Sequence, residues 1–152
     1  MTTGIFTGSF NPFTIGHDAI VKRALRMMDR IIIGVGTNRQ KNNELSADER
    51  VNQINKVYTN NQRIEVKAYS GLSVDFAIAE QATCFVKGVR SVKDFEYERE
   101  QAELNRRLSG IDTILLIAEP GYSGISSSLV RELMSFGRDV SEFLPNPKIN
   151  NE

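Results

Sequence analysis

The fold is decided by the stretch Gly8-Ser9-Phe10-Asn11-Pro12-Phe13-Thr14-Ile15-Gly16-His17, which contains the single histidine of the 152-residue chain. An apolar run at residues 4–7 precedes it, and a segment with helical spacing begins near Gly16. A strand that breaks into a turn with glycine and serine and continues as a helix is a common way to build an anion site. The first N–H groups of such a helix lack partners and carry partial positive charge, so we expect the site here.

Strand-like and helix-like segments alternate beyond this turn. We expect strands at 4–7, 30–36, 63–69, 83–87 and 112–117, and helices at 16–28, 46–58, 73–81, 92–108 and 126–137. The helical spacing predicts buried faces made by Ile20, Ala24, Met27 and Met28, and by Val74, Ala77 and Ile78. The alternation predicts an α/β fold: a doubly wound, five-stranded parallel sheet with helices on both faces, in a single domain over residues 1–152 with a polar, frayed tail from 146. Ligands of such sheets bind beyond the carboxyl ends of the strands, where strand order reverses.

Composition restricts the possible partners. The formal net charge is zero, so no overall field would draw the chain to nucleic acid or to an anionic membrane surface. No apolar run approaches the roughly 18 residues that span a bilayer, and the N-terminus lacks the regions of a signal peptide. The one cysteine, Cys84, excludes an internal disulfide, and its apolar surroundings predict a buried, inert thiol. We therefore expect a cytoplasmic protein with neither nucleic-acid nor membrane partners.

Cations and hydroxyls follow the predicted strands. His17 at a helix start is either structural or a donor to bound phosphate. Lys41 lies in a polar loop and is either solvated or part of the site. Lys87 and Arg90 flank Gly88, which permits close backbone approach by an anion. The serines at 126–128 open a helix and offer hydroxyl and backbone donors, for a phosphate or for simple capping.

Several kinds of chemistry are disfavoured by the same residues. Neither a GxGxxG nor a GxxxxGK[ST] motif is present, so this is not a usual dinucleotide fingerprint or P-loop. No Gly-x-Ser-x-Gly elbow and no acid–base–nucleophile arrangement point to hydrolysis. The spacing of His, Cys and Asp residues predicts no tight zinc site. The acidic helix at 92–108 has sparse apolar positions, so we expect it to pack on another subunit or to line a cleft.

Together these pieces resemble a known family. Thr14-Ile15-Gly16-His17 looks like the (T/H)xGH signature of the nucleotidyltransferase superfamily, and residues 125–132 resemble its ISSS-type C-terminal signature. Within it the chain is similar to bacterial phosphopantetheine adenylyltransferases over about residues 5–145. The specific carriers are the block 88–98 with Gly88-Val89-Arg90, together with Lys41, Asn105-Arg106 and Phe143-Leu144-Pro145.

The resemblance implies a Rossmann-like nucleotidyltransferase domain and a reaction. The enzyme would transfer the adenylyl group of ATP to 4′-phosphopantetheine, giving dephospho-coenzyme A and pyrophosphate in coenzyme A biosynthesis. The substrate phosphate would attack the α-phosphorus in line, with no covalent enzyme intermediate. Mg²⁺ would be bound mainly through the ATP phosphates, with no protein metal site. The family also implies a homohexamer and feedback by coenzyme A.

Site roles follow from the resemblance position by position. His17, Lys41 and Arg90 would be catalytic. ATP would contact Ser9, Phe10, His17, Gly88, Val89, Arg90, Glu98, Tyr122, Ser123, Gly124, Ile125, Ser126, Ser127 and Ser128. The acceptor would contact Ser9, Lys41, Ser73, Lys87 and Asn105.

Three positions depart from the family pattern. Ser9 stands where threonine is usual and Asn11 where aspartate is usual, and Lys87 replaces an arginine and loses its bidentate fork. Two alternatives remain open. One is an adenylyl- or cytidylyltransferase for another phosphate, such as nicotinamide mononucleotide or glycerol 3-phosphate, which the block 88–98 disfavours. The other is a non-catalytic nucleotide-binding or receiver-like module, which would want acidic rather than cationic strand ends.

Overall fold

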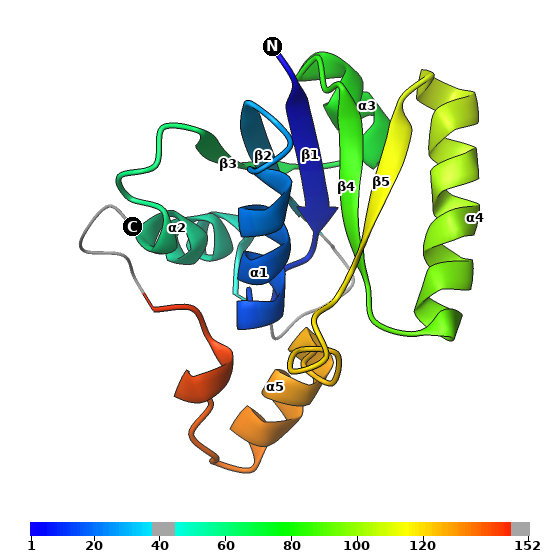
Figure 1. Cartoon of the computed structure of the whole chain (residues 1–152). Coiled ribbons are helices and arrows are strands. Elements are labelled where there is room, and N and C mark those ends of the chain that lie inside the picture. Colours follow the sequence, from blue (N-terminus) through cyan, green and yellow to red (C-terminus); the bar gives the residue numbers. More distant parts are fainter. Residues whose placement is uncertain (38–44, 147–152) are drawn as a thin grey trace.

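A computed structural model describes residues 1–37 and 45–146. Its strands are β1 (Thr3–Gly8), β2 (Arg30–Gly36), β3 (Ile64–Tyr69), β4 (Cys84–Val89) and β5 (Asp112–Ile117). Its helices are α1 (Ile15–Ala24), α2 (Ala47–Val57), α3 (Ser73–Ala79), α4 (Val92–Ser109) and α5 (Ser127–Ser135), followed by a 3₁₀ turn, η1 (Ser141–Phe143). Strands and helices alternate as the sequence predicts (Figure 1). Lys41 and residues 147–152 of the predicted tail lie outside the described residues.

The five strands form one parallel sheet in the order β3-β2-β1-β4-β5. The chain therefore winds outward from β1 to β3 and then returns to place β4 on the other side of β1, which makes the β1–β4 boundary the switch point. The pairing of β1 with β2 continues to Gly8↔Val35, whereas its pairing with β4 stops at Ile5↔Phe85. Beyond that pair β1 and β4 separate, so a crevice opens at their carboxyl ends.

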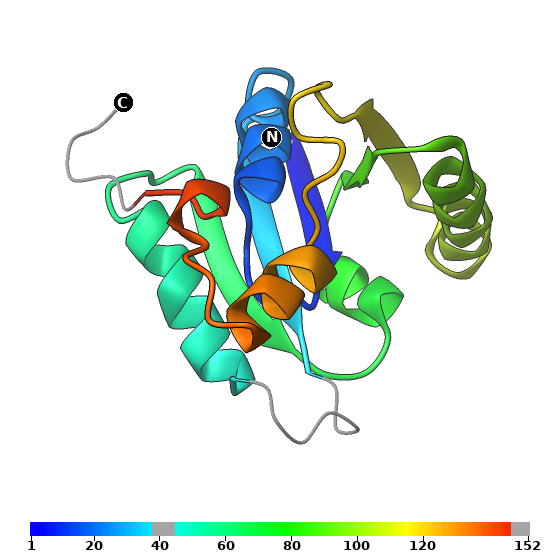
Figure 2. The same cartoon turned by 90° about the horizontal axis from the view of Figure 1, so that it is seen from below.

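Helices cover both faces of the sheet. α1 and α2 pack on one face, where Ile20, Val21 and Ile54 join the core around Ile31 and Ile33. α3 packs on the other face through Val74 and Ala77, against Ile5, Ile32 and Phe85. α4 lies over β4 and β5 beside α3, and α5 lies beyond the carboxyl ends of the strands (Figures 1 and 2). The doubly wound α/β prediction is confirmed.

Local signals in the sequence account for the helix ends. Ser46 and Glu49 form the capping box of α2, with the Ser46 side chain accepting from the Glu49 N–H at 3.2 Å. Gly110 adopts the left-handed conformation (φ 76°) that terminates α4. Cys84 is buried, as predicted, with its Sγ 3.8 Å from the Met28 Sδ. These local signals therefore set the start of α2 and the end of α4.

Three predicted details are wrong. α1 ends at Ala24, so Met27 lies past the helix and is 53% exposed, while the following turn returns Met28 to the core. Ile78 is half exposed because the short helix α3 buries only its narrow stripe of Val74 and Ala77. β4 runs on through Val89, which pairs with Ile117. Gly88 is therefore a strand residue, whereas the sequence predicted a strand that ends at Lys87.

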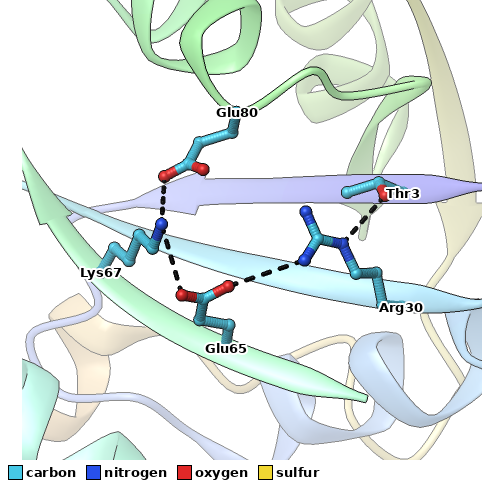
Figure 3. A network of polar contacts seen from close by, with 5 residues as sticks. All are labelled: Thr3, Arg30, Glu65, Lys67 and Glu80. Carbon is cyan, nitrogen blue, oxygen red and sulfur yellow. Dashed lines mark hydrogen bonds and ion pairs between the residues drawn. The ribbon is translucent and has the colours of Figure 1, made fainter. Parts of the chain in front are cut away.

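A group of ion pairs fastens α3 to the edge of the sheet. Lys67 of β3 contacts Glu80 at the end of α3 (2.6 Å) and Glu65 on its own strand (3.3 Å). Arg30 continues the group by pairing with Glu65 and donating to the Thr3 hydroxyl (Figure 3). These contacts lie away from the crevice. Among the described helices, none is both long and apolar enough to cross a membrane.

Candidate active site

A cavity of about 410 Å³ occupies the crevice at the switch point. Its walls come from the end of β1, the start of α1, the end of β4, the first turns of α4 and the start of α5. Segments that are more than 100 residues apart in the sequence thus meet at one edge of the sheet. This is the place that the topology predicts for a ligand.

Twelve of the predicted site residues line this cavity: Ser9, Phe10, His17, Lys87, Gly88, Arg90, Glu98, Tyr122, Ile125, Ser126, Ser127 and Ser128. Val89 points into the core and is 6% exposed. Ser123, Gly124, Ser73 and Asn105 are not among the lining residues, and Lys41 lies outside the described ones. The roles predicted for all these residues remain predictions.

The lining residues that received no role from the sequence include Thr14, Asp94 and Arg131. Each had a local signal. Thr14 stands three residues before His17, at capping-box spacing, and Asp94 stands one helical turn after Arg90. Arg131 follows the serines by one turn, so its side chain folds back toward them. Such spacings predict a neighbour but not that both neighbours face a cavity.

The capping box of α1 fixes the histidine. The Thr14 side chain caps the helix by accepting from the His17 N–H at 3.4 Å, and the Thr14 N–H donates to the His17 Nδ1 at 2.9 Å. A ring nitrogen that accepts carries no proton, so this bond assigns the proton of the neutral ring to Nε2. The histidine therefore serves both as a helix cap and as an N–H donor beside the cavity.

Three phenylalanine rings surround the imidazole. Phe10 meets it edge to face, with ring centroids 5.0 Å apart, and Phe13 and Phe6 lie at 5.3 and 6.1 Å. Burial lowers the pKa of His17 from its ordinary 6.5 to about 4, with smaller contributions from the charges of Arg90 and Lys87. His17 is therefore neutral at pH 7 and acts as a hydrogen-bond donor without a charge of its own.

Lys87 spans the gap between the two diverging strands. Its Nζ donates to the Thr7 carbonyl at 3.0 Å, across from β4 to β1. Burial lowers the pKa of Lys87, and the Glu98 carboxylate acts in the opposite direction. Burial raises the pKa of Glu98. The charge of Lys87 lowers this pKa, and the charge of Asp94 raises it further. The two charged groups thus interact electrostatically on the wall of the cavity, and an incoming anion would compete with Glu98 for the ammonium.

Arg90 joins α4 to the loop before α5. The Asp94 carboxylate accepts from the Arg90 backbone N–H at 3.0 Å and lies 3.7 Å from its Nε. The guanidinium also donates to the Ile125 carbonyl at 3.4 Å. Its side chain is 41% exposed, so its remaining donors face the open side of the cavity.

The serine hydroxyls hold α5 in place. Ser126 is the N-cap and accepts from the Leu129 N–H at 3.1 Å, Ser127 donates to the Pro12 carbonyl at 2.7 Å, and Ser128 accepts from Arg131 at 3.2 Å. Arg131 also donates to the Asn11 carbonyl at 2.6 Å. The capping interpretation is confirmed for Ser126. The anion donors that this leaves are the O–H groups of Ser126 and Ser128, which only accept in these bonds, and the first backbone N–H groups of the helix.

Protein ligands for a metal are few here. Among the described residues, no three His, Cys, Asp or Glu side chains are placed to hold an ion. Asp94 and Glu98 line the cavity, but the first pairs with Arg90 and the second faces Lys87. A divalent ion that arrives on substrate phosphates and keeps several waters needs few such protein ligands.

Comparison with known proteins relates the chain to nucleotidyltransferases. Residues 5–133 match the cytidylyltransferase-like family model. The chain is 54% identical to phosphopantetheine adenylyltransferase of Porphyromonas gingivalis (93% of this chain, 92% of the relative). It is 50% identical to the protein of that name from Phocaeicola vulgatus (95% and 96%).

The fold alone is shared more widely. A structure of a bifunctional NMN adenylyltransferase/ADP ribose pyrophosphatase from Francisella tularensis, in complex with AMP and a manganese ion, superposes with a TM-score of 0.73 at 13% identity. That match covers 97% of this chain and 45% of the longer one, so this chain spans less than half of its length. With the relatives of high identity along nearly the whole length, the chain belongs to the phosphopantetheine adenylyltransferase family of cytidylyltransferase-like nucleotidyltransferases.

Proposed function

We propose that this protein transfers the adenylyl group of ATP to 4′-phosphopantetheine and releases dephospho-coenzyme A and pyrophosphate. The family membership supports the reaction. The observation in the structure that carries it is the convergence, in one cavity, of a neutral histidine donor, two cations and a helix N-terminus. Such a set binds and neutralises two phosphate groups, and it contains no activated nucleophile.

The cavity supports a division of labour between its two sides. The triphosphate lies at the N-terminus of α5 and near Arg90, where backbone N–H groups and a guanidinium meet oxygen anions. The acceptor phosphate lies on the β1 side, within reach of the Ser9 hydroxyl and Lys87. His17 stands between them and donates its Nε2–H to an oxygen of the α-phosphoryl group. Lys41 bridges the two phosphates in this proposal, and Ser73 and Asn105 contact the pantetheine arm.

The reaction needs little covalent chemistry from the protein. An acceptor oxygen forms a bond to the α-phosphorus as the bond to the β-phosphate bridging oxygen breaks, and the electron pair leaves with pyrophosphate. Negative charge spreads over the α-phosphoryl oxygens in the transition state. A donor placed there is worth a few kcal/mol, and a neutral imidazole suits the role because its proton stays on Nε2 throughout. Holding two anions in line supplies much of the remaining acceleration.

Mg²⁺, a homohexameric assembly and a cytoplasmic location complete the proposal. Magnesium would be held mainly by the ATP phosphates and would neutralise part of their charge, in agreement with the sparse carboxylates of the cavity. The exposed apolar residues of α4, among them Val92 and Tyr97, support a subunit contact along that helix. Inhibition by coenzyme A is the remaining prediction, since it would use the same acceptor side.

The acceptor identity is tested by pyrophosphate release. The protein is incubated with Mg-ATP and, in parallel, with 4′-phosphopantetheine, nicotinamide mononucleotide or glycerol 3-phosphate. The proposal predicts turnover with the first acceptor and only background with the other two. Turnover with nicotinamide mononucleotide alone would keep the adenylyl transfer and overturn the substrate. If none of the three acceptors leads to pyrophosphate release, the enzyme assignment is overturned.

A further inference from the structure

A buried arginine lies next to the turn between β1 and α1, outside the cavity. Arg50 of α2 is 4% exposed and is not among the residues that line the cavity. Its guanidinium donates to the carbonyls of Ser9, Gly36 (3.1 Å) and Leu45 (3.2 Å). No carboxylate pairs with it among residues 1–37 and 45–146. Burying a guanidinium without a carboxylate costs desolvation free energy, and here its hydrogen bonds go to backbone carbonyls. We therefore ask what the positions of those carbonyls determine.

The carbonyl of Ser9 belongs to the peptide unit that enters Phe10. Phe10 has a φ of 48°, in the left-handed region that residues with a side chain rarely adopt. On its other side, the Asn11 carbonyl accepts from Arg131 at 2.6 Å. Two guanidinium groups from different helices thus hold the Ser9–Phe10 peptide before this torsion and the Asn11–Pro12 peptide one residue beyond it. A strained torsion persists when its surroundings fix it in this way.

The strained torsion turns the Phe10 ring back over the end of β1. A Cβ on Gly8 would meet that ring at 3.1 Å, so the glycine is what lets the ring lie there. The ring is 4% exposed and meets the His17 imidazole edge to face at an angle of 88°. It also packs on Phe6 and Phe13, which complete the aromatic enclosure. A change in the Phe10 torsion would therefore alter the wall that orients the imidazole.

We propose that Arg50 is a positioning residue for the adenylyl transfer: it holds the Ser9–Phe10 peptide, and through the Phe10 ring it acts together with the Thr14 bond to keep His17 in its orientation. The effect on catalysis rests on the proposed function, whereas the effect of Arg50 on the orientation of the His17 ring does not. When a hydrogen-bond donor to the reacting phosphoryl group is displaced by about 1 Å, the rate can fall on the order of 100-fold. Arg50→Met should thus lower kcat on the order of 10- to 100-fold, with a smaller change in the KM for ATP.

The chain offers a matched control at the opposite end of the sheet. Arg63 also donates to three backbone carbonyls, those of Asp29 (2.9 Å), Leu25 (2.5 Å) and Met28 (2.6 Å). These carbonyls lie between the end of α1 and the start of β2, away from the cavity. Arg63 is exposed, unlike Arg50, but Arg63→Met removes the same kind of contact with backbone carbonyls and reports what that loss does to the activity when it occurs away from the cavity.

The experiment combines kinetics with the NMR signals of the single histidine. Wild type, Arg50→Met, Arg50→Lys and Arg63→Met are labelled with ¹⁵N-histidine, and two-bond ¹⁵N–¹H spectra report the tautomer and ring environment of His17. We expect shifted His17 ring signals and a reduced kcat in Arg50→Met, an intermediate change in Arg50→Lys, which keeps charge without the fork, and wild-type signals in Arg63→Met. If Arg50→Met does not fold, Arg50→Lys carries the comparison.

Two results would overturn the proposal. One is His17 ring signals in the folded Arg50 variants that match those of wild type. The other is a loss of kcat that follows the melting temperature equally in the Arg50 and Arg63 variants. A wild-type protein with no turnover of ATP and 4′-phosphopantetheine would instead refute the proposed function, and the ring signals would still test the positioning.

Discussion

The backbone N–H of Thr14 donates to the Nδ1 of His17 at 2.9 Å. The bond closes the N-terminus of α1 and, at the same time, leaves the imidazole proton on Nε2. Helix capping and donor orientation are thus one interaction. A neutral ring with a fixed tautomer can stabilise charge on a phosphoryl oxygen without taking part in proton transfer.

Substitutions of His17 separate the two roles of its ring. In His17→Asn the side-chain oxygen can still accept from Thr14, but no donor reaches the position of Nε2. In His17→Gln the longer amide can place an N–H there. We expect kcat to fall about 100- to 1000-fold in His17→Asn, as for loss of one oxyanion donor, and by less in His17→Gln.

Binding of ATP provides the control for that comparison. The dissociation constant for ATP, measured by calorimetry without acceptor, should change far less than kcat in both variants, because the donor acts chiefly in the transition state. Equal losses in ATP binding and in kcat would assign His17 to ground-state binding.

The low pKa of His17 makes stability depend on acid. In the window between about pH 4 and 6.5, the unfolded chain binds a proton at this histidine that the folded chain does not. Stability from this group is therefore complete above pH 6.5 and is lost as the pH falls, by about 2 kcal/mol between about pH 7 and 5. Urea unfolding of wild type and His17→Gln at both pH values checks this. The same loss in both proteins would contradict the low pKa.

Ser126 offers a test of the anion site at α5. Ser126→Ala removes the N-cap and should cost about 1 kcal/mol of unfolding free energy. Ser126→Asp keeps a capping oxygen but adds a negative charge at the mouth of the cavity. We expect near wild-type stability and about 10-fold or more weaker ATP binding in Ser126→Asp, by the energy of one nearby like charge. Unchanged ATP affinity in the aspartate variant would place the triphosphate elsewhere.

Lys87 should matter more to the acceptor than to ATP. Lys87→Met removes the ammonium on the β1 side of the cavity and leaves Glu98 without its cation. We expect the KM for 4′-phosphopantetheine to rise about 10-fold or more, as for loss of one charge-assisted hydrogen bond, and the KM for ATP to rise less. Lys67→Met, at the far edge of the sheet, is the matched loss of a lysine and should leave both constants unchanged. An equal rise in both constants of Lys87→Met would reject the division of the cavity.

Local patterns were enough to predict most of the fold. The run 30–36 matches β2 and the run 112–117 matches β5, because β-branched and apolar residues favour strands. Periodicity failed where it could not reveal an end. The apolar spacing of α1 continues past Ala24, so it predicts a helical Met27, although the helix ends at Ala24.

The site was predictable in its parts but not in its arrangement. His17 and the serines stood out because they open helices after strands. The contacts of Arg50 join residues 41 and 14 positions away, and no spacing within α2 points to the carbonyls of Ser9 and Gly36. The separation of β1 from β4 beyond Ile5 is likewise a property of the sheet, which no single segment encodes.

The most direct test of the account follows the oxygen atoms of the acceptor. 4′-Phosphopantetheine carrying ¹⁸O in its three non-bridging phosphate oxygens is incubated with the protein and Mg-ATP, and the products are analysed by mass spectrometry. Attack of the acceptor on the α-phosphorus predicts dephospho-coenzyme A that retains all three labelled oxygens, together with unlabelled pyrophosphate. Absence of dephospho-coenzyme A, or release of AMP with a pyrophosphorylated acceptor, would contradict it.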